Sequence, residues 1–168
     1  MGRAVGTLPT GLPVWAVTSL DNHLFVLRAD QCSQKIEYYD IDSYHLLGCI
    51  RFHFHELGTV EDIVACKHNR CVYVSVRSNE SAIIVISVTN IVMLVYVAVT
   101  IAGWPVDDEP SCLALTATHG VLVTCSAVRK IKEFSRNGEL LHEVTLPEDV
   151  LSVPHNPVVQ RRVHCVPR

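Results

Sequence analysis

The sequence predicts an all-β chain built from a repeated four-stranded unit. The first observation is a hairpin pattern, in which two apolar stretches flank a polar turn, with its three copies centred on Asn22, Asn69 and His119. The second is the spacing of the turns, which is 69 − 22 = 47 and then 119 − 69 = 50 residues. The third is that the outer half of the first unit recurs in the third. Hairpins that recur every ~40–50 residues are typical of β-propeller blades.

The first unit contains four strand-like stretches. They are Val14–Ser19, Leu24–Arg28, Lys35–Asp40 and Tyr44–Ile50. The first two flank Asp21-Asn22-His23, and Asp and Asn suit hairpin turns because they tolerate positive φ. Residues 1–13 contain several Gly and Pro and are expected to form a lead-in segment.

The third unit repeats the same plan. Lys130–Phe134 resembles residues 35–39, residues 139–144 resemble residues 45–50, and Ser135-Arg136-Asn137-Gly138 is a strong turn signal. We therefore predict units at about 14–58, 59–106 and 107–147, the start of a fourth at 148–153, and an irregular tail at 154–168.

Three units and the start of a fourth form an incomplete β-propeller, because a ring usually needs about four to eight blades. The expectation is that the chain is a fragment of a ring, that another chain completes it, or that the units form an open stack. If the chain is complete, its uncovered apolar faces and strand edges predict self-association.

The second unit departs from the pattern, because no charged residue occurs between Ser81 and Val106. Residues 82–103 are long and apolar enough to be considered as a membrane helix. We favour two buried strands, since β-branched residues dominate and the repeat requires an outer hairpin here. The alternative is a protein that attaches to a membrane through residues 82–103.

Composition limits the function classes. The chain has 168 residues and a net charge of −3, so it lacks the overall basic surplus of most proteins that bind nucleic acid. Seven cysteines without a CxxC pair, and no visible signal peptide, predict a reducing, cytoplasmic setting. Cys66 and Cys71 flank one hairpin and are interpreted as free thiols.

Acidic residues precede three of the units. They are Glu61, Asp62, Asp107, Asp108, Glu109, Glu148 and Asp149. In a propeller the connection into each innermost strand lies near the central channel, so these residues could form an acidic rim with oxygen ligands for a hard cation. The alternative is that they are turn and solubility residues. His53 and His55, with Glu56 adjacent, could supply two metal ligands, but a third ligand from elsewhere would be needed.

Arg129, Lys130 and Lys132, with Phe134 nearby, form a short basic stretch that could contact RNA. The alternative is a solvated face of an outer strand. No GxSxG, HExxH or phosphate-binding Gly-rich motif is present in the sequence. We therefore predict no catalytic residue, no cofactor and no resident metal.

The hairpin around Val121–Thr124, the strand Lys130–Phe134 and the turn Ser135–Glu139 resemble the repeats of NHL-type and related six-bladed β-propellers. The resemblance covers about residues 14–153 and implies a binding scaffold, often one module of a larger protein. It favours a non-enzymatic module for protein–protein interaction. The alternatives are an RNA-binding NHL-like propeller, a metal-dependent propeller hydrolase and the membrane-attached form.

Overall fold

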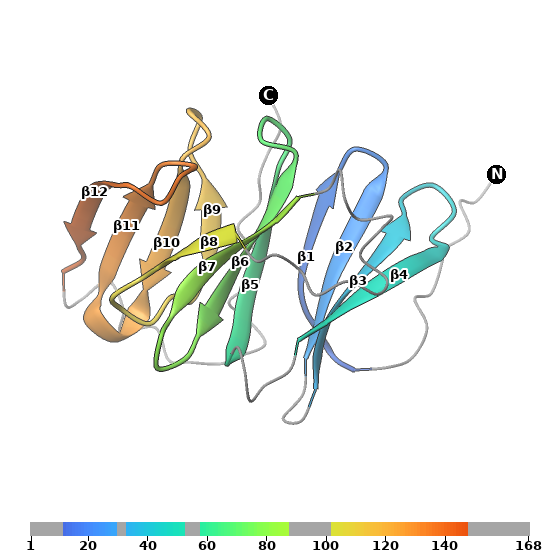
Figure 1. The fold of residues 1–168 in the computed structure, drawn as a ribbon, viewed down its shortest axis with the longest axis horizontal. Helices are drawn as coiled ribbons and strands as arrows, with labels where there is room; N and C mark the ends of the chain where they lie inside the picture. The colour runs from blue at the N-terminus through green and yellow to red at the C-terminus, as the bar shows by residue number, and fades with distance from the viewer. Residues whose placement is uncertain (1–11, 30–32, 53–57, 88–101, 148–168) are drawn as a thin grey trace.

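The computed structural model describes residues 12–29, 33–52, 58–87 and 102–147 (Figure 1). These residues form three antiparallel sheets, A, B and C, each with four strands in chain order. Sheet A contains β1 Val14–Leu20, β2 His23–Ala29, β3 Gln34–Asp40 and β4 Leu46–Phe52. Sheet B contains β5 Thr59–Cys66, β6 Cys71–Arg77, β7 Ala82–Ser87 and β8 Ala102–Pro105. Sheet C contains β9 Leu113–Leu115, β10 Val121–Cys125, β11 Lys130–Phe134 and β12 Leu140–Thr145.

The predicted all-β architecture of about three four-stranded blades is confirmed. The sheets lie side by side in the order A, B, C, with β1 against β5 and β5 against β9 (Figure 1). A short 3₁₀ helix, Ser126–Val128, connects β10 to β11. Most of the lead-in, the start of a fourth unit at 148–153 and the tail at 154–168 lie outside the described residues.

Sheet B is covered on both of its faces. Val72, Val74 and Ile84 belong to a core shared with sheet A, whereas Tyr73 and Ile83 belong to a second core shared with sheet C. Because successive side chains of a strand point to opposite faces, a strand covered on both sides is apolar at successive positions along its buried part. This position explains why β7 carries no charged residue.

The two ends of the apolar segment 82–103 are strands, as the strand interpretation expects, because β7 and β8 pair with each other in sheet B. Residues 88–101 lie outside the described part of the chain. Within the part that is described, no helix is both long and apolar enough to cross a membrane.

The turns of the three inner hairpins share one backbone conformation but use different residue types to adopt it. Asp21 adopts φ of 51°, as its residue type favours, but Arg70 at 50° and His119 at 65° hold the same left-handed conformation in the other two turns. Neighbouring turns also touch, since the rings of His68 and His119 stack with their centroids 4.2 Å apart. Tyr44 has φ of 55°, so β4 begins two residues later than the sequence indicates.

Gly138, in the turn between β11 and β12, provides a test of the packing between sheets B and C. Its φ is +85°, and a Cβ added there would lie 2.5 Å from the Cβ of Trp104. We expect Gly138→Ala to lower the free energy of unfolding by about 1–3 kcal/mol, from left-handed strain and displacement of the indole. Urea denaturation measures this, with the exposed neighbour Asn137→Ala as control. Equal midpoints for the two variants would contradict the contact.

Candidate binding site at the inner rim

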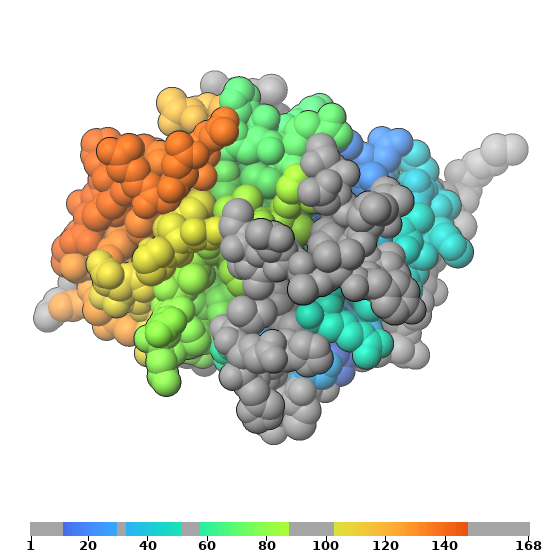
Figure 2. Space-filling view, viewed as in Figure 1, coloured from blue at the N-terminus to red at the C-terminus, as the bar shows by residue number. Residues whose placement is uncertain are grey.

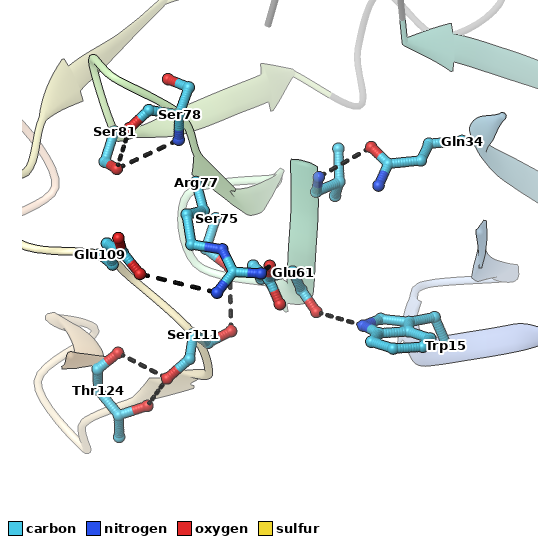
Figure 3. Close-up of polar contacts among 11 residues, drawn as sticks. Trp15, Gln34, Glu61, Ser75, Arg77, Ser78, Ser81, Glu109, Ser111 and Thr124 are labelled. Carbon is cyan, nitrogen blue, oxygen red and sulfur yellow. Dashed lines mark hydrogen bonds and ion pairs between the residues drawn. The ribbon is translucent and has the colours of Figure 1, made fainter. Parts of the chain in front are cut away.

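The inner rim is the end of the stack at which β1, β5 and β9 begin. Four residues from sheets A and B and from the connection into sheet C lie close together there, and we call them the rim cluster (Figure 3). They are Trp15 of β1, Glu61 of β5, Arg77 of β6 and Glu109 in the connection to β9. Two of the four, Glu61 and Glu109, are members of the acidic set that the sequence indicates.

Hydrogen bonds and ion pairs connect the rim cluster in a line from sheet A, across sheet B, to the connection that leads into sheet C. The indole Nε1 of Trp15 donates to the main-chain oxygen of Glu61 at 3.0 Å. The guanidinium of Arg77 lies 2.7 Å from Glu61 Oε1 and 3.7 Å from Glu109 Oε2. The Glu61 side chain is 14% exposed, whereas those of Arg77 and Glu109 are 49% and 58% exposed. Glu61 therefore fixes the position of Arg77, while Arg77 itself faces solvent.

Backbone bulges position two members of the cluster. The pairing of β1 with β2 shifts between Val14 and Ala16, and the pairing of β5 with β6 shifts between Val60 and Asp62. Trp15 and Glu61 are therefore the extra residues of two equivalent bulges. A bulge redirects the side chain of the extra residue, and bulges are over-represented beside functional sites. Trp15 remains 41% exposed at this position.

Asp62 and a nearby hydroxyl group form hydrogen bonds that connect sheet B to the start of sheet C next to the rim cluster. Asp62 accepts hydrogen bonds from the backbone N–H groups of Ile63 and Leu113, both at 2.9 Å, and so ties β5 to β9. The hydroxyl of Ser75 contacts the main-chain oxygen of Ser111 at 3.3 Å. Asp62 thus has a structural use, and the inner ends of sheets B and C are held rigidly together.

The other acidic positions do not join the cluster. Asp108 forms an ion pair with Lys132 at 2.7 Å, and the Lys132 side chain is only 5% exposed. Burial alone would lower the pKa of Lys132, but the hydrogen bond and charge of Asp108 outweigh burial and raise it. Asp107 is exposed to solvent, and Glu148 and Asp149 lie outside the described residues.

The basic stretch does not form one surface. Lys132 is buried on the side of sheet C that faces sheet B, so its interpretation as part of a solvated strand face is wrong. Lys130 pairs with Glu143 at 2.9 Å, and Arg129 occupies the left-handed turn before β11. Positive charges that are already paired in this way contribute less to binding a phosphate backbone.

The remaining candidate residues are three possible metal ligands and two cysteines. His53, His55 and Glu56 lie outside the described residues. Among those that are described, no three His, Cys, Asp or Glu side chains are grouped closely enough to hold a metal ion. Cys66 and Cys71 are paired neighbours on β5 and β6 and are free thiols. Burial raises the pKa of Cys71, which makes its thiolate less available.

Solved structures are similar to this fold. A protein from Lactobacillus plantarum matches with a TM-score of 0.55 and 14% identity over 84% of this chain and 44% of that chain. Kuenenia stuttgartiensis hydrazine synthase matches with a TM-score of 0.57 and 12% identity over 77% and 49%. A protein of unknown function from Bacteroides caccae matches with a TM-score of 0.53 and 15% identity over 83% and 48%.

These neighbours are propeller-like, and at such identities they show the fold alone. The chain spans about half the length of each. No protein-family model and no curated protein sequence matches the chain. The propeller-type fold is therefore shown, whereas assignment to the NHL branch remains a prediction.

Proposed function

We propose that the chain is a non-enzymatic, propeller-type binding module that recognises a protein partner through the rim cluster. The supporting observation is that Trp15 and Arg77 are both solvent-accessible and that both contact Glu61. The Trp15 indole donates to the main-chain oxygen of Glu61, and the Arg77 guanidinium pairs with its carboxylate. Tryptophan and arginine are the residue types that most often dominate the energetics of protein interfaces. Loops and strand ends on a rigid scaffold are also where binding residues concentrate.

The surroundings of the cluster favour tight recognition. Glu61 orients Arg77 before any partner arrives, and the bonds of Asp62 and Ser75 hold sheets B and C in register beneath it. Pre-ordered side chains lose less conformational entropy on binding, so more of the contact energy contributes to affinity. The partner segment should offer an apolar side chain to the Trp15 ring and acceptor groups to Arg77.

A reducing, cytoplasmic setting is part of this proposal. The five cysteines in the described part of the chain are free thiols, and three of them are buried. Persistent free thiols are typical of proteins in reducing compartments.

The experiment first uses the wild-type chain as the bait in an affinity purification from cells, in order to isolate partner proteins. Titration calorimetry then measures the affinity of the chain for each purified partner. We expect Trp15→Ala and Arg77→Ala each to weaken binding by about tenfold or more, equivalent to ~1.4 kcal/mol. Arg136→Ala, which removes an exposed arginine from the turn between β11 and β12, should leave the affinity unchanged. Circular dichroism spectra verify that all three variants are folded.

Two outcomes would overturn the proposal. One is a purified partner that binds wild type and both rim variants with the same affinity. The other is recovery of RNA as the saturable ligand, with an affinity that falls steeply with salt and is unaffected by Trp15→Ala, because binding of that kind depends on phosphate contacts.

A further inference from the structure

The turns of the inner hairpins lie at the end of the stack opposite to the rim cluster (Figure 1). The turn of sheet B, residues 67–70, connects β5 to β6, and the turn of sheet C, residues 116–120, connects β9 to β10. Figure 2 shows these two turns, coloured green and light orange, at the upper edge of the molecule. Each turn carries an exposed histidine, His68 in the first and His119 in the second. Two imidazole side chains are therefore accessible from solvent at this end.

The two histidine rings meet across the boundary between sheets B and C. Their centroids lie 4.2 Å apart, and their planes differ by only 6°. In a tetrahedral zinc site each imidazole nitrogen lies ~2.0–2.1 Å from the ion, so two such nitrogens are about 3.3 Å apart. A small rotation of each ring about its side-chain bonds brings one nitrogen of each to that separation. The spacing of the pair therefore suits joint coordination of one ion.

Hydrogen bonds within each turn hold the two histidines in place. The N–H of Arg70 donates to the main-chain oxygen of Lys67 at 3.3 Å, and the N–H of His119 donates to that of Thr116 at 3.0 Å. The N–H of Gly120 donates to the Thr116 hydroxyl at 2.9 Å. Ligands that are ordered before binding lose less conformational entropy, so this pair is better suited to chelation than histidines on two independent loops.

The charges beside the pair are compatible with a bound cation. Arg70, on the same turn as His68, pairs at 3.7 Å with Asp21 in the neighbouring turn of sheet A, which partly offsets its positive charge. Lys67 is exposed, so solvent and salt screen its charge.

We propose that His68 and His119 together bind a divalent transition-metal ion, with zinc as the favoured ion, and so connect the turn ends of sheets B and C. Neutral imidazole is a common ligand for zinc. Water completes the coordination, because the described residues hold no group of three His, Cys, Asp or Glu side chains that fits a metal ion. Two protein ligands make an exchangeable site, unlike the closed four-ligand sites of structural zinc. The ion would join the same two sheets that Asp62 connects at the rim.

The test is titration calorimetry of the chain, with its thiols reduced, against Zn²⁺. We expect His68→Ala and His119→Asn each to weaken zinc binding at least tenfold, and asparagine is chosen because it tolerates the φ of 65° at position 119. His142→Ala, which removes an exposed histidine from β12, is the matched control and should bind zinc as wild type does. Because both rings bind one ion, the double variant should be within about threefold of the weaker single variant.

Thiolates are the competing ligands for zinc, and the variants distinguish them from the histidine pair. A wild-type chain that does not bind zinc overturns the proposal, as does zinc binding that is equal in wild type and both histidine variants, which is what coordination by cysteine produces. Losses that add in the double variant also overturn it, because they indicate two independent sites.

Stability supplies a second readout. Zinc should raise the urea midpoint of wild type and of His142→Ala but not that of the two histidine variants, because an ion bound across sheets B and C stabilises only the folded chain. An equal rise in all four proteins contradicts a site made by the pair. Zinc binding here is independent of the rim cluster, so Trp15→Ala should leave it unchanged.

Discussion

Ile83→Asp is expected to prevent the chain from folding. Ile83 lies in β7, is fully buried, and belongs to the core between sheets B and C. An aspartate there would place an unpaired carboxylate among apolar side chains, which costs about 4 kcal/mol or more. Because single domains are stable by only ~5–15 kcal/mol, the variant should show weak tertiary structure and a greatly reduced urea midpoint.

Val17→Asp is the matched control, because it makes the same kind of change on a strand at an exposed position. Val17 in β1 is 53% exposed, so its carboxylate would remain hydrated. We expect a change in the free energy of unfolding within about 0.5–1 kcal/mol, measured by the same urea titration. Equal losses at the two positions would contradict the burial of sheet B between its neighbours.

Local pattern was sufficient to predict most of the fold. The strand Lys130–Phe134 has the same bounds in sequence and structure, because turn residues border it on both sides. The second unit was ambiguous for a physical reason. Alternation of polar and apolar residues identifies a strand with one solvated face, and β7 has none. A strand that is buried on both faces and a membrane helix are both uncharged and apolar throughout, so composition alone does not distinguish them.

The candidate site was only partly predictable. Acidic residues near the start of the second and third units could be found from spacing, and Glu61 and Glu109 do reach the inner rim. Glu109 precedes β9 as predicted, but Glu61 lies within β5 rather than before it. Arg77 and Trp15 were missed, because their contact with Glu61 depends on two bulges that insert extra residues into β1 and β5. An apolar run that continues through Trp15 without alternation is the only trace of the first bulge. Similarly, Lys-x-Lys spacing cannot tell which face of β11 is buried.

Glu37→Gln should produce the second large loss of stability. The Glu37 carboxylate accepts hydrogen bonds from Arg28 and from the Tyr39 hydroxyl at 2.6 Å, and Lys35 lies 2.7 Å away. The Arg28 guanidinium is buried and also donates to the main-chain oxygen of Leu12 at 2.8 Å. Removing the negative charge leaves a buried cation uncompensated, so we expect a loss of about 3 kcal/mol in urea denaturation.

The pH dependence separates this electrostatic effect from a simple packing defect. Burial alone would raise the pKa of Glu37, but hydrogen bonds from Lys35, Tyr39 and Arg28 outweigh burial and hold it below its ordinary value. The stability it contributes is therefore fully present above the unfolded-state pKa of ~4.3 and is lost as pH falls through the lower folded-state pKa. The difference between wild type and Glu37→Gln should be largest near neutral pH and should narrow in acid.

Glu143→Gln supplies the control for that series, because Glu143 also pairs with a lysine on a neighbouring strand but is far more exposed. Solvent screens an exposed pair, so this variant should change the urea midpoint little at neutral pH. A Glu37→Gln deficit that stays constant from neutral to acid pH would show that shape, rather than charge, explains its loss. A deficit that closes in acid, with Glu143→Gln unaffected, would establish the network as an ionic anchor between sheet A and the segment that precedes β1.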